Sequence, residues 1–252
     1  METINDLLEI NNLKIYQNND WFKFSLESVL LPNFVTLNLR CKNIIDLCTG
    51  NAPIPLILST KTKANIVGVE IQKDVYELAK KSVEINNLDN RIKLINDNLN
   101  NLKEYFEGDY FDIVTVNPPY FPNIPTSEKN KDIHKTIARH EIETNLSEIV
   151  KISAYLLKNG GYLAMVHQTN RFFDVVDVLK KYNFSINKVR FIYPKEDKES
   201  NLFMIEAIKD GNSGVKFLNP LYVHNNDGTY KEEILNMFKN KKEDNLWKWL
   251  LV

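Results

Sequence analysis

Cysteine is scarce in this sequence. Only Cys41 and Cys48 are present, so neither a disulfide framework nor a set of paired zinc ligands is expected. The histidines are scattered as well, which argues against a metal cofactor. No apolar run approaches the roughly 18 residues of a membrane-spanning helix, and the polar N-terminus lacks a signal-peptide core. These absences predict a cytoplasmic protein with no membrane partner.

An excess of charge of one sign is also absent. The net charge is −1, so no overall basic field attracts nucleic acid, and such a partner would have to be held by local patches. The hydrophobic fraction is 43%, and the charges are interspersed, as in folded proteins. We expect one domain over 1–252, with an N-terminal hairpin and helix cap at 1–40, a core at 41–210 and a C-terminal extension at 211–252. Nothing indicates an obligate protein partner.

Strands and helices alternate through the core. Apolar and β-branched runs predict strands at 43–47, 66–70, 92–95, 111–116, 162–166, 186–192 and 202–208. Helical patterns lie at 54–60, 74–87, 145–157 and 172–182. This order predicts an α/β fold with a doubly wound, mostly parallel seven-stranded sheet, Rossmann-like in class. The last two strands lack a crossover helix, so we expect an antiparallel hairpin at one edge. Upstream, 13–16 and 21–24 predict a hairpin, followed by a helix within 25–39.

A short stiff turn follows the strand at 111–116. It consists of Asn117, Pro118, Pro119 and Tyr120. Proline has no N–H to donate, so the chain must leave the sheet here. The turn carries an amide, free carbonyls and an aromatic ring, which together suit a planar amine held edge-on beneath a stacked ring. Taken alone, the same residues equally fit a rigid loop.

Three earlier strand ends carry residues that suit a nucleoside-containing cofactor. Small residues after the first core strand let the backbone approach a ligand, and Glu70 stands where an acid binds a ribose diol. Asp97 and Asn98 offer an acceptor and a donor to adenine. A dinucleotide fingerprint is missing, since this turn contains only Gly50, so S-adenosylmethionine is the better candidate. The predicted cofactor residues are Asp46, Cys48, Thr49, Gly50, Asn51, Ala52, Glu70, Ile71, Asp97, Asn98 and Asn117.

With these motifs, most of the chain resembles class I S-adenosylmethionine-dependent methyltransferases of the Asn-Pro-Pro-Tyr type. It is more specifically similar to the bacterial N6-adenine methyltransferases that modify adenine 37 of valine tRNA. The matching segments are 23–31, 46–55, 69–71, 138–141, 160–161 and 227–230. The chain departs from the family at Cys48 and Ala52, where glycine is usual, and at Glu27, where aspartate is usual.

The resemblance implies methyl transfer to the N6 of an anticodon-loop adenine in tRNA, with S-adenosyl-L-homocysteine as the product. The implied catalytic residues are Asn117, Pro118, Pro119 and Tyr120. The expected substrate contacts are Lys23, Phe24, Ser25, Tyr120, Arg139 and His140. Other planar amines remain open as targets, namely rRNA or DNA adenine or a protein glutamine amide. A non-catalytic nucleic-acid-binding module is the alternative from another class.

Overall fold

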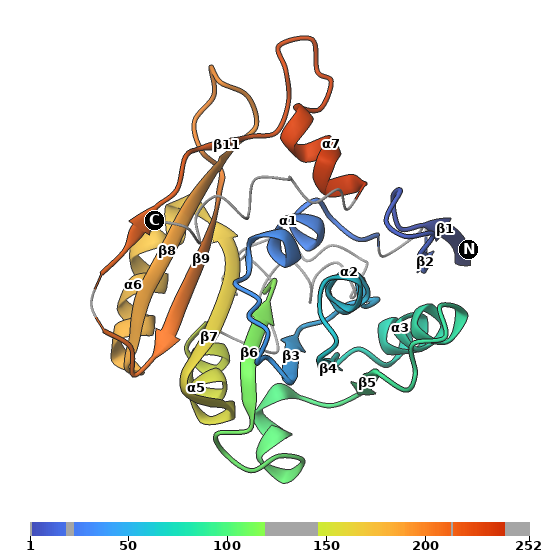
Figure 1. Cartoon of the computed structure of the whole chain (residues 1–252), viewed down its shortest axis with the longest axis vertical. Coiled ribbons are helices and arrows are strands. Elements are labelled where there is room, and N and C mark those ends of the chain that lie inside the picture. The colour runs from blue at the N-terminus through green and yellow to red at the C-terminus, as the bar shows by residue number, and fades with distance from the viewer. Residues whose placement is uncertain (1, 19–22, 119–145, 213, 240–252) are drawn as a thin grey trace, which may run out of the picture.

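The computed structural model describes residues 2–18, 23–118, 146–212 and 214–239, and a large twisted sheet lies at its centre (Figure 1). The described strands of this sheet follow the order β10-β8-β9-β7-β6-β3-β4-β5, with β11 beside β8. Their bounds are β3 Asn43–Leu47, β4 Asn65–Val69, β5 Ile92–Ile95, β6 Phe111–Val116, β7 Leu157–Gln168, β8 Phe184–Tyr193, β9 Leu202–Lys209, β10 Lys216–Phe217 and β11 Leu221–Tyr222.

Helices cover both faces of this sheet (Figure 1). One apolar core joins the sheet to the first three helices, and a second core joins it to α5, α6 and η1. The helices are α1 Glu27–Phe34, α2 Pro53–Lys61, α3 Lys73–Ile85, α5 Leu146–Leu156, α6 Phe172–Lys181 and α7 Glu232–Phe238, with 3₁₀ turns η1 Leu99–Glu104 and η2 Thr169–Arg171. The predicted α/β, doubly wound, mostly parallel fold is therefore confirmed. In the described ranges, no helix is long and apolar enough to cross a membrane.

The antiparallel edge is also confirmed, but the strand count was wrong. β9 runs antiparallel to both β7 and β8, which places the last long strand between them. The main sheet has nine strands in the described part of the chain instead of seven, because β10 and β11 each add a two-residue parallel pairing on β8. Two residues are too few to show a strand period in the sequence.

The N-terminal hairpin pairs differently from the prediction. β2 (Lys14–Asn18) pairs antiparallel with β1 (Glu2–Asp6), and the described Lys23 and Phe24 form no strand with it. β2 lies against α3, where the Tyr16 N–H donates to Ser82 Oγ at 2.9 Å. The Phe24 N–H donates to the Gln17 side chain at 3.1 Å, so this part of the predicted second strand is held by a side chain and not by a ladder. Residues 21 and 22 lie outside the described ranges.

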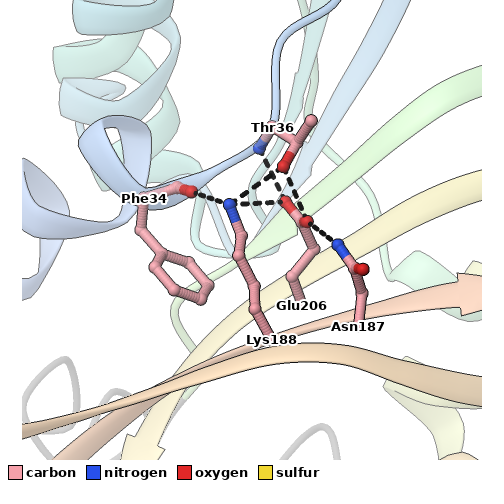
Figure 2. A network of polar contacts seen from close by, with 5 residues as sticks. All are labelled: Phe34, Thr36, Asn187, Lys188 and Glu206. Atoms are coloured by element: carbon pink, nitrogen blue, oxygen red, sulfur yellow. Dashed lines mark hydrogen bonds and ion pairs between the residues drawn. The ribbon is translucent and has the colours of Figure 1, made fainter. Parts of the chain in front are cut away.

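A buried polar network fixes the segment after α1 to the strands β8 and β9 (Figure 2). The fully buried Glu206 carboxylate accepts hydrogen bonds from Thr36 N at 2.6 Å, Thr36 Oγ1 at 2.8 Å and Asn187 Nδ2 at 2.8 Å. Lys188 Nζ lies 3.5 Å from Glu206 Oε2 and donates to Phe34 O at 2.6 Å. Burial lowers the pKa of Lys188, although Glu206 opposes this effect. The network thereby holds the C-terminal end of α1 over the sheet.

Candidate active site

The strand order reverses between β3 and β6, because β4 and β5 continue in one direction and β6 and β7 in the other. In open α/β sheets, ligands bind at such a switch point, beyond the carboxyl ends of the strands. Leu47 pairs with both Val69 and Val116, so all three strands end at the same level. The turn after β3, Glu70 after β4 and Asn117 after β6 therefore meet at one edge of the sheet.

The turn after β3, residues 48–52, is called the cofactor turn below. Cys48, Gly50 and Ala52 have φ values of 56°, 60° and 69°, all in the left-handed region that favours glycine. The backbone thus follows a glycine-type path even where this chain carries Cys48 and Ala52. Asn51 is fully buried, and its Nδ2 donates to Tyr16 O at 2.7 Å, which ties the turn to β2. The Asn51 Oδ1 atom is buried and has no hydrogen-bond partner among the described residues.

Asp46 is the fully buried acid at the start of this site. Its two oxygens accept hydrogen bonds from Thr49 Oγ1 and Thr115 Oγ1, both at 2.6 Å. Burial raises the pKa of Asp46 to about 7, and the nearby Glu70 charge adds to this, while the two threonine hydroxyls lower it. Asp46 therefore titrates near neutral pH, unlike an exposed aspartate.

Glu70 is buried directly after β4 and faces the cofactor turn. Its Oε2 accepts the Gly50 N–H at 3.0 Å, and its Oε1 accepts the Gln72 N–H at 2.9 Å. Burial raises the pKa of Glu70, and the backbone hydrogen bonds from Gln72, Gly50 and Ile71 oppose the rise. The half-buried Ile71 follows, and its carbonyl accepts from Asn96 Nδ2 at 3.1 Å.

Asp97 and Asn98 lie after β5, on the same edge of the sheet. Asp97 accepts hydrogen bonds from the Asn98 N–H, Asn101 Nδ2 and the Tyr105 hydroxyl, of which the hydroxyl bond does most to lower its pKa. Asn98 caps η1 by accepting the Asn100 N–H at 2.9 Å. Both side chains shape the local turn, and both residues remain partly exposed to solvent.

Asn117 is half-buried at the end of β6, and Pro118 is buried behind it. The Asn117 Nδ2 lies 3.5 Å from Ser28 Oγ, which places the start of α1 beside the amide. Lys23 and Ser25 are exposed just before α1, and Phe24 is half-buried. The remaining predicted residues, Pro119, Tyr120, Arg139 and His140, lie outside the described ranges.

Two further residues, which the sequence did not predict, shape this site. Thr115 contacts Asp46 across β6 and β3, and Gly68 lies opposite Asp46 on β4. A Cβ atom at Gly68 would lie 2.8 Å from Leu94 Cδ2 and 3.0 Å from Thr49 Oγ1. Strand pairing, and not local sequence, determines both roles. No group of three His, Cys, Asp or Glu residues suited to a metal ion occurs in the described part of the chain.

We expect Asp46→Asn to reduce the pH dependence of stability. Because the folded-state pKa is raised from 3.8 to about 7, the folded protein retains a proton that the unfolded chain releases. Asp46 thus stabilises the folded state most below about pH 4. As the pH rises to about 7, the free energy of unfolding falls by up to roughly 4 kcal/mol because this contribution is lost. Urea unfolding from pH 4 to 8 measures the effect. Asp89→Asn, at an exposed position, is the control, and equal pH slopes for Asp46→Asn and the parent would contradict the expectation.

Comparisons with known proteins agree with this geometry. The family model described as "Methyltransferase domain" matches residues 40–242. This match spans most of the chain, and the protein therefore belongs to the methyltransferase domain family.

The individual relatives and solved structures share low sequence identity with this chain. The tRNA1(Val) (adenine(37)-N6)-methyltransferase of Parabacteroides distasonis is 24% identical over 204 residues, which cover 80% of this chain and 83% of that protein. Among solved structures, a predicted O-methyltransferase from Agrobacterium tumefaciens matches with a TM-score of 0.67 at 16% identity, over 84% of this chain and 95% of that one. A geranyl diphosphate methyltransferase in complex with SAM matches with a TM-score of 0.55 at 10% identity, over 73% of this chain and 84% of that one. At these identities, the two structures show a shared fold.

Proposed function

We propose that the protein transfers a methyl group from S-adenosylmethionine to the exocyclic N6 of an adenine in tRNA. The observation that carries this proposal is the meeting of the cofactor turn, Glu70 and Asn117 at one switch point of the sheet. We further propose that residues 41–210 form the catalytic core of a single domain, flanked by the cap at 1–40 and the extension at 211–252.

The residues around the cofactor turn suit S-adenosylmethionine. The glycine-type backbone of this turn permits close approach of a ligand, and the buried Asn51 Oδ1 can accept a hydrogen bond from that ligand. The Glu70 carboxylate accepts the Gly50 and Gln72 N–H groups, and its remaining lone-pair capacity suits ribose hydroxyls. Asp97, Asn98 and Ile71 would line the adenine end. When bound, the cofactor supplies an electrophilic methyl group on its sulfonium.

Asn117 and Pro118 would orient the acceptor amine. The lone pair of the adenine N6 is delocalised into the ring, so the nitrogen is a poor nucleophile. Hydrogen bonds from the two N6–H groups to Asn117 Oδ1 and the Pro118 carbonyl would draw the nitrogen toward tetrahedral geometry and direct its lone pair at the methyl group. Holding the reacting atoms about 3–3.5 Å apart supplies up to roughly 7–11 kcal/mol through proximity. Tyr120 would stack on the base, worth about 1–3 kcal/mol.

The substrate assignment rests on the curated relatives. Relatives from Parabacteroides distasonis, Flavobacterium psychrophilum and Phocaeicola vulgatus are all named tRNA1(Val) (adenine(37)-N6)-methyltransferase, and each is 24% identical to this chain. We therefore propose an anticodon-loop adenine at position 37 of valine tRNA as the target. A base in a single-stranded loop is unpaired, so swinging it into the site costs less than extracting it from a helix. Lys23, Phe24, Ser25, Arg139 and His140 are the proposed contacts to this loop.

Labelled cofactor tests the function directly. The full chain is incubated with methyl-labelled S-adenosylmethionine and total tRNA from a strain lacking the enzyme, and the tRNA is then digested to nucleosides. We expect label in N6-methyladenosine, confined to valine tRNA. Label in another nucleoside, or transfer only to rRNA, DNA or a protein glutamine amide, would overturn the assignment. Absence of cofactor binding at millimolar concentration would favour a non-catalytic nucleic-acid-binding module.

A further inference from the structure

Thr115 is a fully buried threonine in β6, two residues before Asn117. Strand register places it directly beside Asp46 on β3. The Thr115 hydroxyl donates to one Asp46 oxygen at 2.6 Å, and the Thr49 hydroxyl donates to the other at 2.6 Å. One carboxyl group therefore joins β6, the strand that leads to Asn117, to the cofactor turn.

Thr49 has little freedom to leave this arrangement. Its side chain lies against Gly68 on β4, where even a single added carbon would come within 3.0 Å of Thr49 Oγ1. Its own N–H donates to Val69 O at 2.9 Å. The turn is thus held by β4 from one side and, through Asp46, by β6 from the other. A shift of β6 relative to β3 would break the Thr115 bond together with the backbone pairing of the two strands.

We propose that Thr115 is a positioning residue for methyl transfer, which acts through Asp46 and Thr49 to hold the cofactor turn in register with Asn117. The proposal rests on the proposed function for its activity measurements. Transfer requires the methyl group and the acceptor nitrogen in line at about 3–3.5 Å, and a misplacement of about 1 Å costs roughly 100-fold in rate. The Thr115–Asp46–Thr49 row adds a side-chain link to the backbone ladder that joins β3 and β6, and it extends that link into the cofactor turn.

The ionisation state of Asp46 decides how this row is bonded. When Asp46 is ionised, both hydroxyls donate to it, which fixes both threonine side chains. When it is protonated, its own O–H must donate to one hydroxyl, whose hydrogen then turns away. Glu70, which directly follows β4, raises the pKa of Asp46 through its charge. The hydrogen bond from the Thr115 hydroxyl lowers the pKa of Asp46. Removal of that hydroxyl would therefore raise the pKa of Asp46 further.

The test compares Thr115→Val, which removes the hydroxyl at nearly constant volume, with Thr115→Ser, which retains it. For the full-length protein we expect Thr115→Val to lower kcat/KM by roughly 10- to 100-fold, as for loss of a hydrogen bond to a charged group. The acid limb of its pH profile should move to higher pH. Thr115→Ser should restore both the rate and the pH profile. Thr60→Val is the matched control, because its hydroxyl donates to Ile57 O at the far end of α2.

Cofactor binding can be measured without any methyl acceptor, so this part of the test does not depend on the identity of the substrate. Titration calorimetry with S-adenosylmethionine, run below the unfolding temperature of every variant, should show weaker binding for Thr115→Val than for Thr115→Ser at each pH. If the parent methylates no tRNA, the proposed function fails, and these titrations still decide the role of Thr115. Parent-like binding and an unmoved acid limb in Thr115→Val would overturn the proposal, and so would a Thr115→Ser variant as impaired as the valine variant.

Discussion

Replacement of Asn117 by alanine is expected to abolish methyl transfer while binding of S-adenosylmethionine survives. The side-chain amide is the acceptor proposed to orient the adenine N6, and alanine retains neither its oxygen nor its hydrogen bond toward Ser28. Loss of a preorganised polar group aimed at the reacting atom costs about 10²–10³ in kcat. Loss of orientation adds to this, since proximity supplies so much of the barrier reduction.

Single-turnover transfer from labelled cofactor measures the rate, and calorimetry measures cofactor binding in the same preparation. Asn90→Ala is the matched control, because Asn90 is an exposed asparagine before β5, at the opposite end of the sheet. This control should retain both activity and binding. Turnover near the parent rate in Asn117→Ala would contradict the mechanism, whereas loss of cofactor binding would assign Asn117 to the cofactor site instead.

The largest effect on stability is expected at Glu206, the centre of the network in Figure 2. Glu206→Ala would leave the half-buried Lys188 ammonium without its counter-charge and would remove the acceptor of the Thr36 N–H. Breaking a buried ion pair in this way costs about 3–5 kcal/mol. Because the network anchors the end of α1, we also expect reduced activity at temperatures at which the variant remains folded.

Denaturant unfolding measures this loss, and a double-mutant cycle assigns it. Lys188→Met combined with Glu206→Ala should cost less than the sum of the single changes, because the double variant buries no unpaired charge. Glu196→Ala is the control, since Glu196 pairs with Lys231 on the surface, and it should change the free energy of unfolding by less than about 1 kcal/mol. A loss of less than about 1 kcal/mol in Glu206→Ala would show that the network is not a stabilising anchor.

Local sequence patterns predicted several strands of the core correctly. The predicted strands at 43–47, 92–95 and 111–116 match β3, β5 and β6 residue for residue. Such agreement is expected for β3 and β6, which are largely buried, rich in apolar and β-branched residues and followed by a turn. The prediction of the N-terminal hairpin was wrong because composition does not specify which strands pair. Residues 21–24 have a strand-like composition, but β2 pairs with β1, and the described Lys23 and Phe24 form no strand.

The sequence by itself determined which residue types end each core strand, and therefore the candidate cofactor turn, Glu70 and Asn117. Only the tertiary structure decided that these strand ends meet, because the order of strands in a sheet depends on long-range pairing that no local pattern records. For the same reason, the roles of Thr115, Gly68 and Glu206 were not predicted from the sequence. Each looks ordinary in the sequence, and each gains its role from a neighbour on another strand or segment, reached only after the sheet has formed.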